Sequence, residues 1–161
     1  MRISLLIDSP LSVLMHAMRG LDSAVRREIA SRTKGVAEPV WLEELRGRAA
    51  TRRQSRLADS GRVGVTQQNV FLRAGLVGKL SSGTPVSAIA KATEFGVNAE
   101  KLIDTRSRKG TRYKRRIGPT FGPTRRQGNV AYPAAREVIR RIASLWIQTA
   151  YRTTHEEIEK V

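Results

Sequence analysis

The amino-acid sequence predicts an α+β fold, in which a small antiparallel sheet is packed by an N-terminal helix and a long C-terminal helix. Three observations support this prediction. Apolar residues recur at helical spacing in residues 14–29 and again in residues 138–149, and they alternate with a period of two in residues 62–73. Helices covering one face of an antiparallel sheet would bury all three apolar faces together.

The chain of 161 residues is expected to form a single domain over residues 1–161. Its hydrophobic content of 40% is enough for a core, and because only 5% of the residues are aromatic, aliphatic side chains must fill most of it. The residues chosen as core are Leu21, Val25, Phe95, Ile142 and Trp146.

The cysteine count and the first residues bear on the compartment of the protein. The absence of cysteine excludes disulfides and thiolate metal sites, which fits assembly in a reducing cytoplasm. The apolar opening is interrupted at Asp8 and Pro10, too soon for a signal peptide or a membrane span, so we expect no membrane partner.

The N-terminal third is expected to hold a short strand followed by helices. Residues 2–7 have the alternation of a strand. Ser9 and Pro10 are typical of a helix start, and Gly35 is expected to end that helix. A second, short helix is expected from Glu38 to Ala49, and the arginines of residues 46–56 are interpreted as a solvated face or loop.

The central third is expected to supply the sheet. Residues 62–66 and 69–73 are predicted strands on either side of a turn at residues 67–68, and the Gly- and Ser-rich residues 75–85 are predicted to form a loop. A third strand is expected from Val86 or Ile89 to Phe95, with Gly96 ending it.

The final helix is predicted to begin at Pro133 and to run to about Glu157. Three glutamates lie near its C-terminal end, where the helix dipole disfavours them, so we expect either fraying or a positively charged partner there. Its predicted apolar face consists of Val138, Ile139, Ile142, Leu145, Trp146 and Thr149.

A strongly basic segment, residues 104–126, lies between the predicted third strand and the final helix. It holds nine lysines and arginines against one acid, Asp104, and so carries about half of the formal net charge of +16. Unpaired charges are costly to bury, and five glycines and prolines disfavour regular structure. We therefore expect residues 104–128 to form an extended basic loop or arm that is solvated or bound to a partner. The cations expected to face a protein interface or DNA are Arg106, Arg108, Lys109, Arg112, Lys114, Arg115, Arg116, Arg125 and Arg126.

The sequence contains no arrangement typical of an active site or a metal site. His16 and His155 lie on separate predicted helices, without an acid or cysteine at ligand spacing. Glu43 and Glu44 are adjacent, so their side chains would point about 100° apart on a helix rather than form a carboxylate pair. Neither a phosphate-binding glycine loop nor a Ser-His-Asp arrangement is found. We expect no catalytic residues, no cofactor and no metal, and thus no enzyme.

Two short motifs flank the basic segment. Residues 90–96 are Ala-Lys-Ala-Thr-Glu-Phe-Gly, and residues 132–135 are Tyr-Pro-Ala-Ala. In this order, after an N-terminal helix and a small sheet, they resemble the layout of head–tail connector and tail-completion proteins of long-tailed bacteriophages. In that family a strand ends in Ala-x-x-Glu-Phe/Tyr-Gly, and a variable loop leads to a C-terminal helix that opens with proline. The resemblance spans nearly the whole chain.

The resemblance implies a structural subunit of the virion neck or tail, assembled in the host cytoplasm. Copies would form a homo-oligomeric ring, six- or twelve-fold, between the capsid connector and the tail tube. The other partners would be neighbouring neck and tail proteins, such as a head-closure protein, a tail terminator or the tube. The basic segment would contact acidic surfaces of these neighbours or face packaged DNA.

Composition also fits a second class, a basic nucleic-acid-binding protein of ribosomal or nucleoid type that uses residues 106–126 as its arm. Tyr113 and Phe121 lie among the cations of this arm and would be placed to stack on bases. No standard recognition motif accompanies them, and the final helix is amphipathic enough to belong to the core. The two hypotheses therefore differ in the partner of the same segment.

Overall fold

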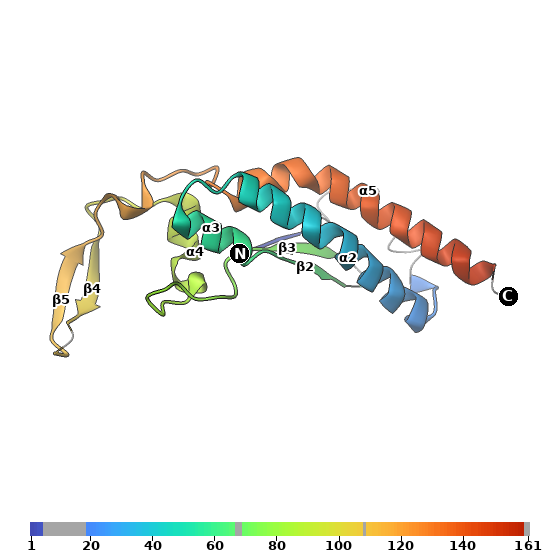
Figure 1. The fold of residues 1–161 in the computed structure, drawn as a ribbon, viewed down its shortest axis with the longest axis horizontal. Helices are drawn as coiled ribbons and strands as arrows, with labels where there is room; N and C mark the ends of the chain where they lie inside the picture. The colour runs from blue at the N-terminus through green and yellow to red at the C-terminus, as the bar shows by residue number, and fades with distance from the viewer. Residues whose placement is uncertain (5–18, 67–68, 108, 160–161) are drawn as a thin grey trace.

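The computed structural model describes residues 1–4, 19–66, 69–107 and 109–159. Two long helices, α2 (Ser23–Gly47) and α5 (Ala131–Ile158), lie side by side along an elongated body (Figure 1). A small antiparallel sheet packs against α2, and a separate two-stranded hairpin projects from the opposite end of the body to the C-terminus. The predicted α+β class is confirmed.

The sheet of the body has three strands in the order β1-β3-β2, all antiparallel. They are β1 (Arg2–Ser4), β2 (Arg62–Val65) and β3 (Val70–Arg73). The two central predicted strands are therefore confirmed, and the predicted strand 2–7 is confirmed over β1. The remainder of that strand and the predicted turn at residues 67–68 lie outside the described residues.

Helix α2 differs from the prediction at both ends. It begins at Ser23, where the Asp22 side chain accepts a hydrogen bond from the Ala24 amide at 2.6 Å, and the chain is not helical at residues 20–22. The predicted single helix through residues 14–29 is therefore wrong, and the start expected at Ser9 and Pro10 lies outside the described residues. The helix also passes through Gly35, which was expected to end it, and continues to Gly47.

Packing explains why α2 continues through a glycine and a proline. One face of the helix is buried every fourth residue from Ile29 to Leu45, against α5 and β2. Pro39 is exposed and off that face, so it does not interrupt the packed stripe. The expected short helix from Glu38 is thus the second half of α2. The buried stripe consists of Ile29, Thr33, Ala37, Trp41 and Leu45.

Two shorter helices follow. Helix α3 (Arg52–Asp59) opens with a capping box, in which the Thr51 hydroxyl accepts from the Gln54 amide and the Gln54 side chain accepts from the Thr51 amide. The arginines of this helix are exposed, as expected of a solvated face, but Leu57 and Ala58 are buried, so the segment is not a loop.

Helix α4 (Val86–Phe95) corrects the predicted third strand. Its buried residues Val86, Ala90 and Glu94 are four apart, which is helical spacing, and a short apolar run does not by itself distinguish a helix from a strand. Gly96 ends the element as predicted, with a positive φ of 68°. The preceding loop, residues 75–85, is also found, with one isolated bridge between Lys79 and Pro85.

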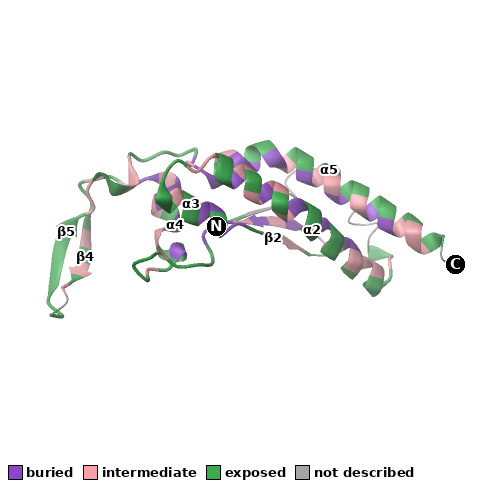
Figure 2. Ribbon diagram, in the orientation of Figure 1, coloured by how far each residue is buried: buried purple, intermediate pink, exposed green. Residues whose placement is uncertain are grey.

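The core lies between α2, α5 and the sheet and extends to α3 and α4 (Figure 2). Ile142 and Trp146 on α5 are fully buried, as predicted. Leu21 and Val25 are only partly buried at its edge, and Phe95 is half-buried outside the core. The other apolar residues predicted on this face are buried (Val138) or half-buried (Ile139, Leu145 and Thr149).

The glutamates near the end of α5 have a partner within the chain. Glu156 accepts from Arg32 of α2 and, at 2.9 Å, from Arg152. The hydrogen bond from Arg32 and then the one from Arg152 lower the pKa of the Glu156 carboxyl. This cation on α2 explains the acidic residue at the disfavoured end of the helix dipole.

Candidate interaction arm

The basic segment forms an antiparallel hairpin, β4 (Leu102–Arg106) with β5 (Arg112–Arg116), which we call the arm (Figure 1). The expectation that residues 104–128 lack regular structure is therefore wrong for the arm. β4 alternates Ile103 and Thr105 with Asp104 and Arg106, a pattern that fits a pleated ribbon, whereas β5 holds Tyr113 among four cations. Past the arm, only the short 3-10 turn η1 (Pro119–Phe121) interrupts the irregular chain that leads to α5.

The turn of the arm depends on one glycine and two hydroxyl-bearing residues. The Ser107 amide donates to the Thr111 carbonyl at 2.9 Å, and the Ser107 hydroxyl accepts from the Thr111 amide at 3.1 Å. Gly110 has a φ of +87°, which residues with a side chain rarely adopt. Gly110, which is expected to disfavour regular structure, therefore closes the hairpin instead.

The arm has two different faces, because residues that pair across the strands share a face. Arg106 lies directly opposite Arg112, and Asp104 lies opposite Lys114. The other face carries the partly apolar pairs Ile103–Arg115 and Thr105–Tyr113. All five residues of β5 are exposed (Figure 2). The more charged face consists of Leu102, Asp104, Arg106, Arg112, Lys114 and Arg116.

Most of the cations predicted to face a partner lie on the arm, and two lie outside it. Lys109 lies in the turn, Arg108 is outside the described residues, and Arg116 forms an exposed ion pair with Glu100 at 2.9 Å. Arg125 and Arg126 are exposed but belong to the chain that returns to the body. The cations on the two strands are Arg106, Arg112, Lys114, Arg115 and Arg116.

A buried carboxylate anchors the chain that returns from the arm. Glu94 of α4 is fully buried. One of its oxygens accepts from the amides of Val130 and Ala131 at 3.1 and 2.9 Å, and the other from the Tyr132 amide at 2.9 Å. Val130, the residue at the N-cap of α5, has no side-chain acceptor of its own, so Glu94 satisfies the first amides of the helix instead.

Further contacts join residues 93–97 to residues 122–132, and we call these two segments together the clasp. The Arg125 amide donates to the Phe95 carbonyl at 2.8 Å, and the Val97 amide to the Gly122 carbonyl at 3.2 Å. The Phe95 and Tyr132 rings lie 5.3 Å apart between centroids. Since the clasp holds the chain just before and just after the arm, it fixes where the arm leaves the body.

Two glycines are required for this close approach. Gly96 and Gly128 have φ of +68° and +77°. A Cβ on Gly96 would collide with the Pro123 carbonyl oxygen, and one on Gly128 with the Glu94 carboxylate. The Glu-Phe-Gly motif thus ends a helix and meets the start of α5, and is not the end of a strand.

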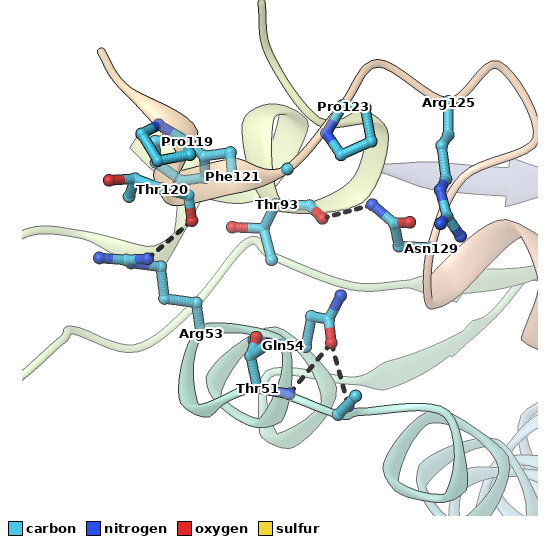
Figure 3. Close-up of a pocket in the computed structure, with 12 residues that line it drawn as sticks. Thr51, Arg53, Gln54, Thr93, Pro119, Thr120, Phe121, Pro123, Arg125 and Asn129 are labelled. Atoms are coloured by element: carbon cyan, nitrogen blue, oxygen red, sulfur yellow. Dashed lines mark hydrogen bonds between the residues drawn. The ribbon is translucent and has the colours of Figure 1, made fainter. Parts of the chain in front are cut away.

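A cavity of about 380 Å³ lies beside the clasp, between η1 and the N-terminus of α3 (Figure 3). Arg53 of α3 donates to the Thr120 carbonyl at 3.0 Å, and its guanidinium lies 5.4 Å from the centroid of the Phe121 ring. Across the cavity, the Asn129 side chain donates to the Thr93 carbonyl at 3.2 Å. The lining contains two arginines and no acid, histidine or cysteine, so it holds no carboxylate or imidazole base.

The sequence reasoning missed Glu94, Gly128, Asn129 and Arg53 as residues that position the arm. A signal existed, because Val130 cannot cap the proline-led helix that follows it, and some other acceptor had to do so. Nothing in the local sequence identifies Glu94, 36 residues earlier, as that acceptor.

No family model, curated protein or solved structure matches the chain. Within the described ranges there is no group of three His, Cys, Asp or Glu residues that could hold a metal ion. Nor does any described helix combine the length and apolar character needed to cross a membrane.

Proposed function

We propose that the protein is a structural, non-enzymatic subunit of a bacteriophage virion neck, of the head–tail connector or tail-completion type. Copies form a ring between the capsid connector and the tail tube, and the arm of each copy contacts an acidic surface of a neighbouring neck or tail protein. The observation that supports this proposal is an exposed basic hairpin held at a fixed exit from the body by the clasp.

The hairpin itself argues for a partner. A two-stranded hairpin is at best marginally stable in water, since it buries little surface. Here β5 is exposed along its whole length. Arg106 and Arg112 lie directly opposite each other, and the repulsion between their like charges destabilises the pairing of the two strands. An acidic surface on a neighbour would cover the hairpin and offset this repulsion.

The rest of the chain suits a ring subunit. The core of α2, α5 and the three-stranded sheet provides a folded body, and the arm extends from one end of it (Figure 1). A patch at one end that binds a different patch on the next copy or neighbour gives a head-to-tail contact, and such contacts close into rings when the rotation allows. Such a subunit requires no catalytic group.

The second candidate function, nucleic-acid binding, gains support from one observation. The segment is a two-stranded antiparallel ribbon, and the major groove of B-DNA admits such a ribbon. Three cations of β5, Arg112, Lys114 and Arg116, lie on the same face of it, where they would contact phosphates. The two candidate functions are therefore distinguished by whether the arm binds a protein or DNA.

The test replaces Arg112, Lys114, Arg115 and Arg116 together with glutamine. Because all four side chains are exposed, the melting temperature should barely change, while the yield of joined, tailed particles should collapse. The matched control replaces four exposed cations on the outer faces of α2 and α5, namely Lys34, Arg136, Arg140 and Arg141, and should leave the yield unchanged.

Binding of the purified protein to duplex DNA completes this test. If the arm holds phosphates, the affinity should fall with salt at a log–log slope of about −0.9 per contact, and the four substitutions should flatten that slope by up to about 3.6. Normal particle yield from the arm variant together with a flattened slope would reject the neck proposal in favour of nucleic-acid binding.

A further inference from the structure

The arm has two open edges, and the hydrogen-bond register shows which residues face each edge. The Ser107 amide donates to the Thr111 carbonyl, and the Ile117 amide to the Lys101 carbonyl. In an antiparallel ladder such pairs alternate with pairs whose amides and carbonyls point outward. Tyr113 and Arg115 therefore bond to β4, whereas the backbone groups of Arg112, Lys114 and Arg116 face the open edge of β5.

The side chains on the two open edges differ in charge. The outward-facing residues of β4 are Leu102, Asp104 and Arg106, which sum to no net charge, whereas those of β5 are three cations. A strand pairing with β5 would place its own alternate side chains beside these cations, and like charges directly opposite are destabilising. The open edge of β5 thus rejects β5 of a second copy and favours a strand with acidic residues at alternate positions.

We propose that β5 accepts an extended acidic segment of a neighbouring protein as a third strand of the arm. This inference rests on the proposed function, because it names how the arm holds its neighbour. The added strand bonds to the outward amides and carbonyls of Arg112, Lys114 and Arg116, and its alternate carboxylates lie beside their side chains.

The other face of the arm favours the same kind of segment. On this face β5 presents Tyr113, which is 47% exposed, and Arg115, with Ile103 and Thr105 behind them on β4. The remaining alternate residues of an added strand would lie on this face beside Tyr113 and Arg115, where β-branched side chains pack well against the aromatic ring and the aliphatic stem of the arginine. The fitting partner therefore alternates Asp or Glu with Val, Ile or Thr. Duplex DNA would meet the same cations but would not pair the outward amides and carbonyls in the regular ladder that an added strand forms.

The first measurement uses the full-length protein and a capped synthetic peptide of sequence Thr-Glu-Val-Glu-Val-Glu-Thr, with amide hydrogen exchange followed by NMR. In the free protein the outward amides of Arg112, Lys114 and Arg116 should exchange faster than the inward amides of Tyr113 and Arg115. Saturating peptide should slow the outward amides by about tenfold or more, as expected when a strand hydrogen bond forms, and change the inward ones little.

Two substitutions of Lys114 distinguish the contribution of backbone hydrogen bonding to peptide affinity from the contribution of charge. Lys114→Pro removes both the outward amide and the charge, and leaves the bonds between β4 and β5 in place because the amide of residue 114 faces the open edge. Lys114→Gln removes the charge alone and serves as the matched control. The proline variant should bind the peptide about fivefold more weakly than the glutamine variant, since it also lacks one backbone hydrogen bond.

The outcomes distinguish this inference from the proposed function. Three results would overturn the proposal of an added strand. The first is peptide binding without protection of the outward amides, and the second is equal affinity of the two Lys114 variants for the peptide. The third is equal binding of a peptide that has lysine in place of glutamate. A failure to bind the peptide while a short duplex DNA binds and shifts the same resonances would overturn it as well. The proposed function would survive any of these results if the fourfold arm variant still lost particle joining.

Discussion

At the scale of single residues, Glu94 anchors the chain that returns from the arm. The sequence marks it as part of a short motif, but its role depends on three amides at the start of α5, the N-cap included, that lie 36 to 38 residues later. Periodicity reports which face of an element is apolar, so it predicted the buried Ile142 and Trp146 correctly. It carries no information about a buried polar group whose partners are distant in sequence.

Glu94→Gln should destabilise the protein by about 1–3 kcal/mol, the typical cost of leaving a buried amide without an acceptor. The carboxylate uses both oxygens to accept from three N–H groups, and the amide NH₂ of glutamine cannot accept. The control Glu43→Gln changes the same charge at an exposed position of α2 and should cost no more than about 0.5 kcal/mol. Equal midpoints of urea unfolding for both variants would show that the carboxylate does not hold the clasp.

At the scale of elements, the sequence predicted what local patterns determine and failed where long-range packing decides. β2, β3 and α5 have clear periods and were predicted correctly. Gly35 and Pro39 are breakers by propensity, yet α2 runs through both because its buried face packs on α5 and β2. The arm was missed because its charge suggested disorder, although two features that favour a hairpin, the turn at Gly110 and the alternation of β4, are local.

Trp146→Ala tests the contact between α5 and the rest of the core. Trp146 is fully buried on the face of α5 that packs on α2, so its removal should cost about 3–5 kcal/mol through lost burial and a cavity. Tyr151→Ala truncates another large side chain of the same helix that is 74% exposed, and should cost no more than about 0.5 kcal/mol. An unfolding free energy unchanged by Trp146→Ala would contradict the core assignment.

At the scale of the whole molecule, the elongated shape places much of the positive charge at one end. The arm projects from one end of an elongated body, and the C-terminus lies at the other (Figure 1). The sequence predicted the order of helices and strands well enough to give the fold class. It did not predict that the clasp holds the densest positive charge away from the core, because the clasp depends on contacts between residues on either side of the arm.

The net charge of +16 predicts how stability responds to salt. Folding brings like charges closer together, so their repulsion destabilises the compact state, whereas exposed ion pairs such as Arg46–Asp59 contribute only about 0–1 kcal/mol each. Raising the NaCl concentration from about 0.01 to about 1 M shortens the screening length from about 30 to about 3 Å. Because repulsion outweighs the exposed pairs, we expect about 1 kcal/mol of added stability, or a melting temperature about 2–4 °C higher.

The fourfold arm variant supplies the control for this prediction. Its net charge is +12, since it lacks four of the cations that give +16, so its melting temperature should rise less with salt than that of the parent protein. A melting temperature that falls as NaCl is added would mean that the exposed ion pairs, and not the excess of cations, dominate the electrostatics of folding. The arm would then be a minor source of strain in the free protein, and an acidic partner would have less repulsion to offset.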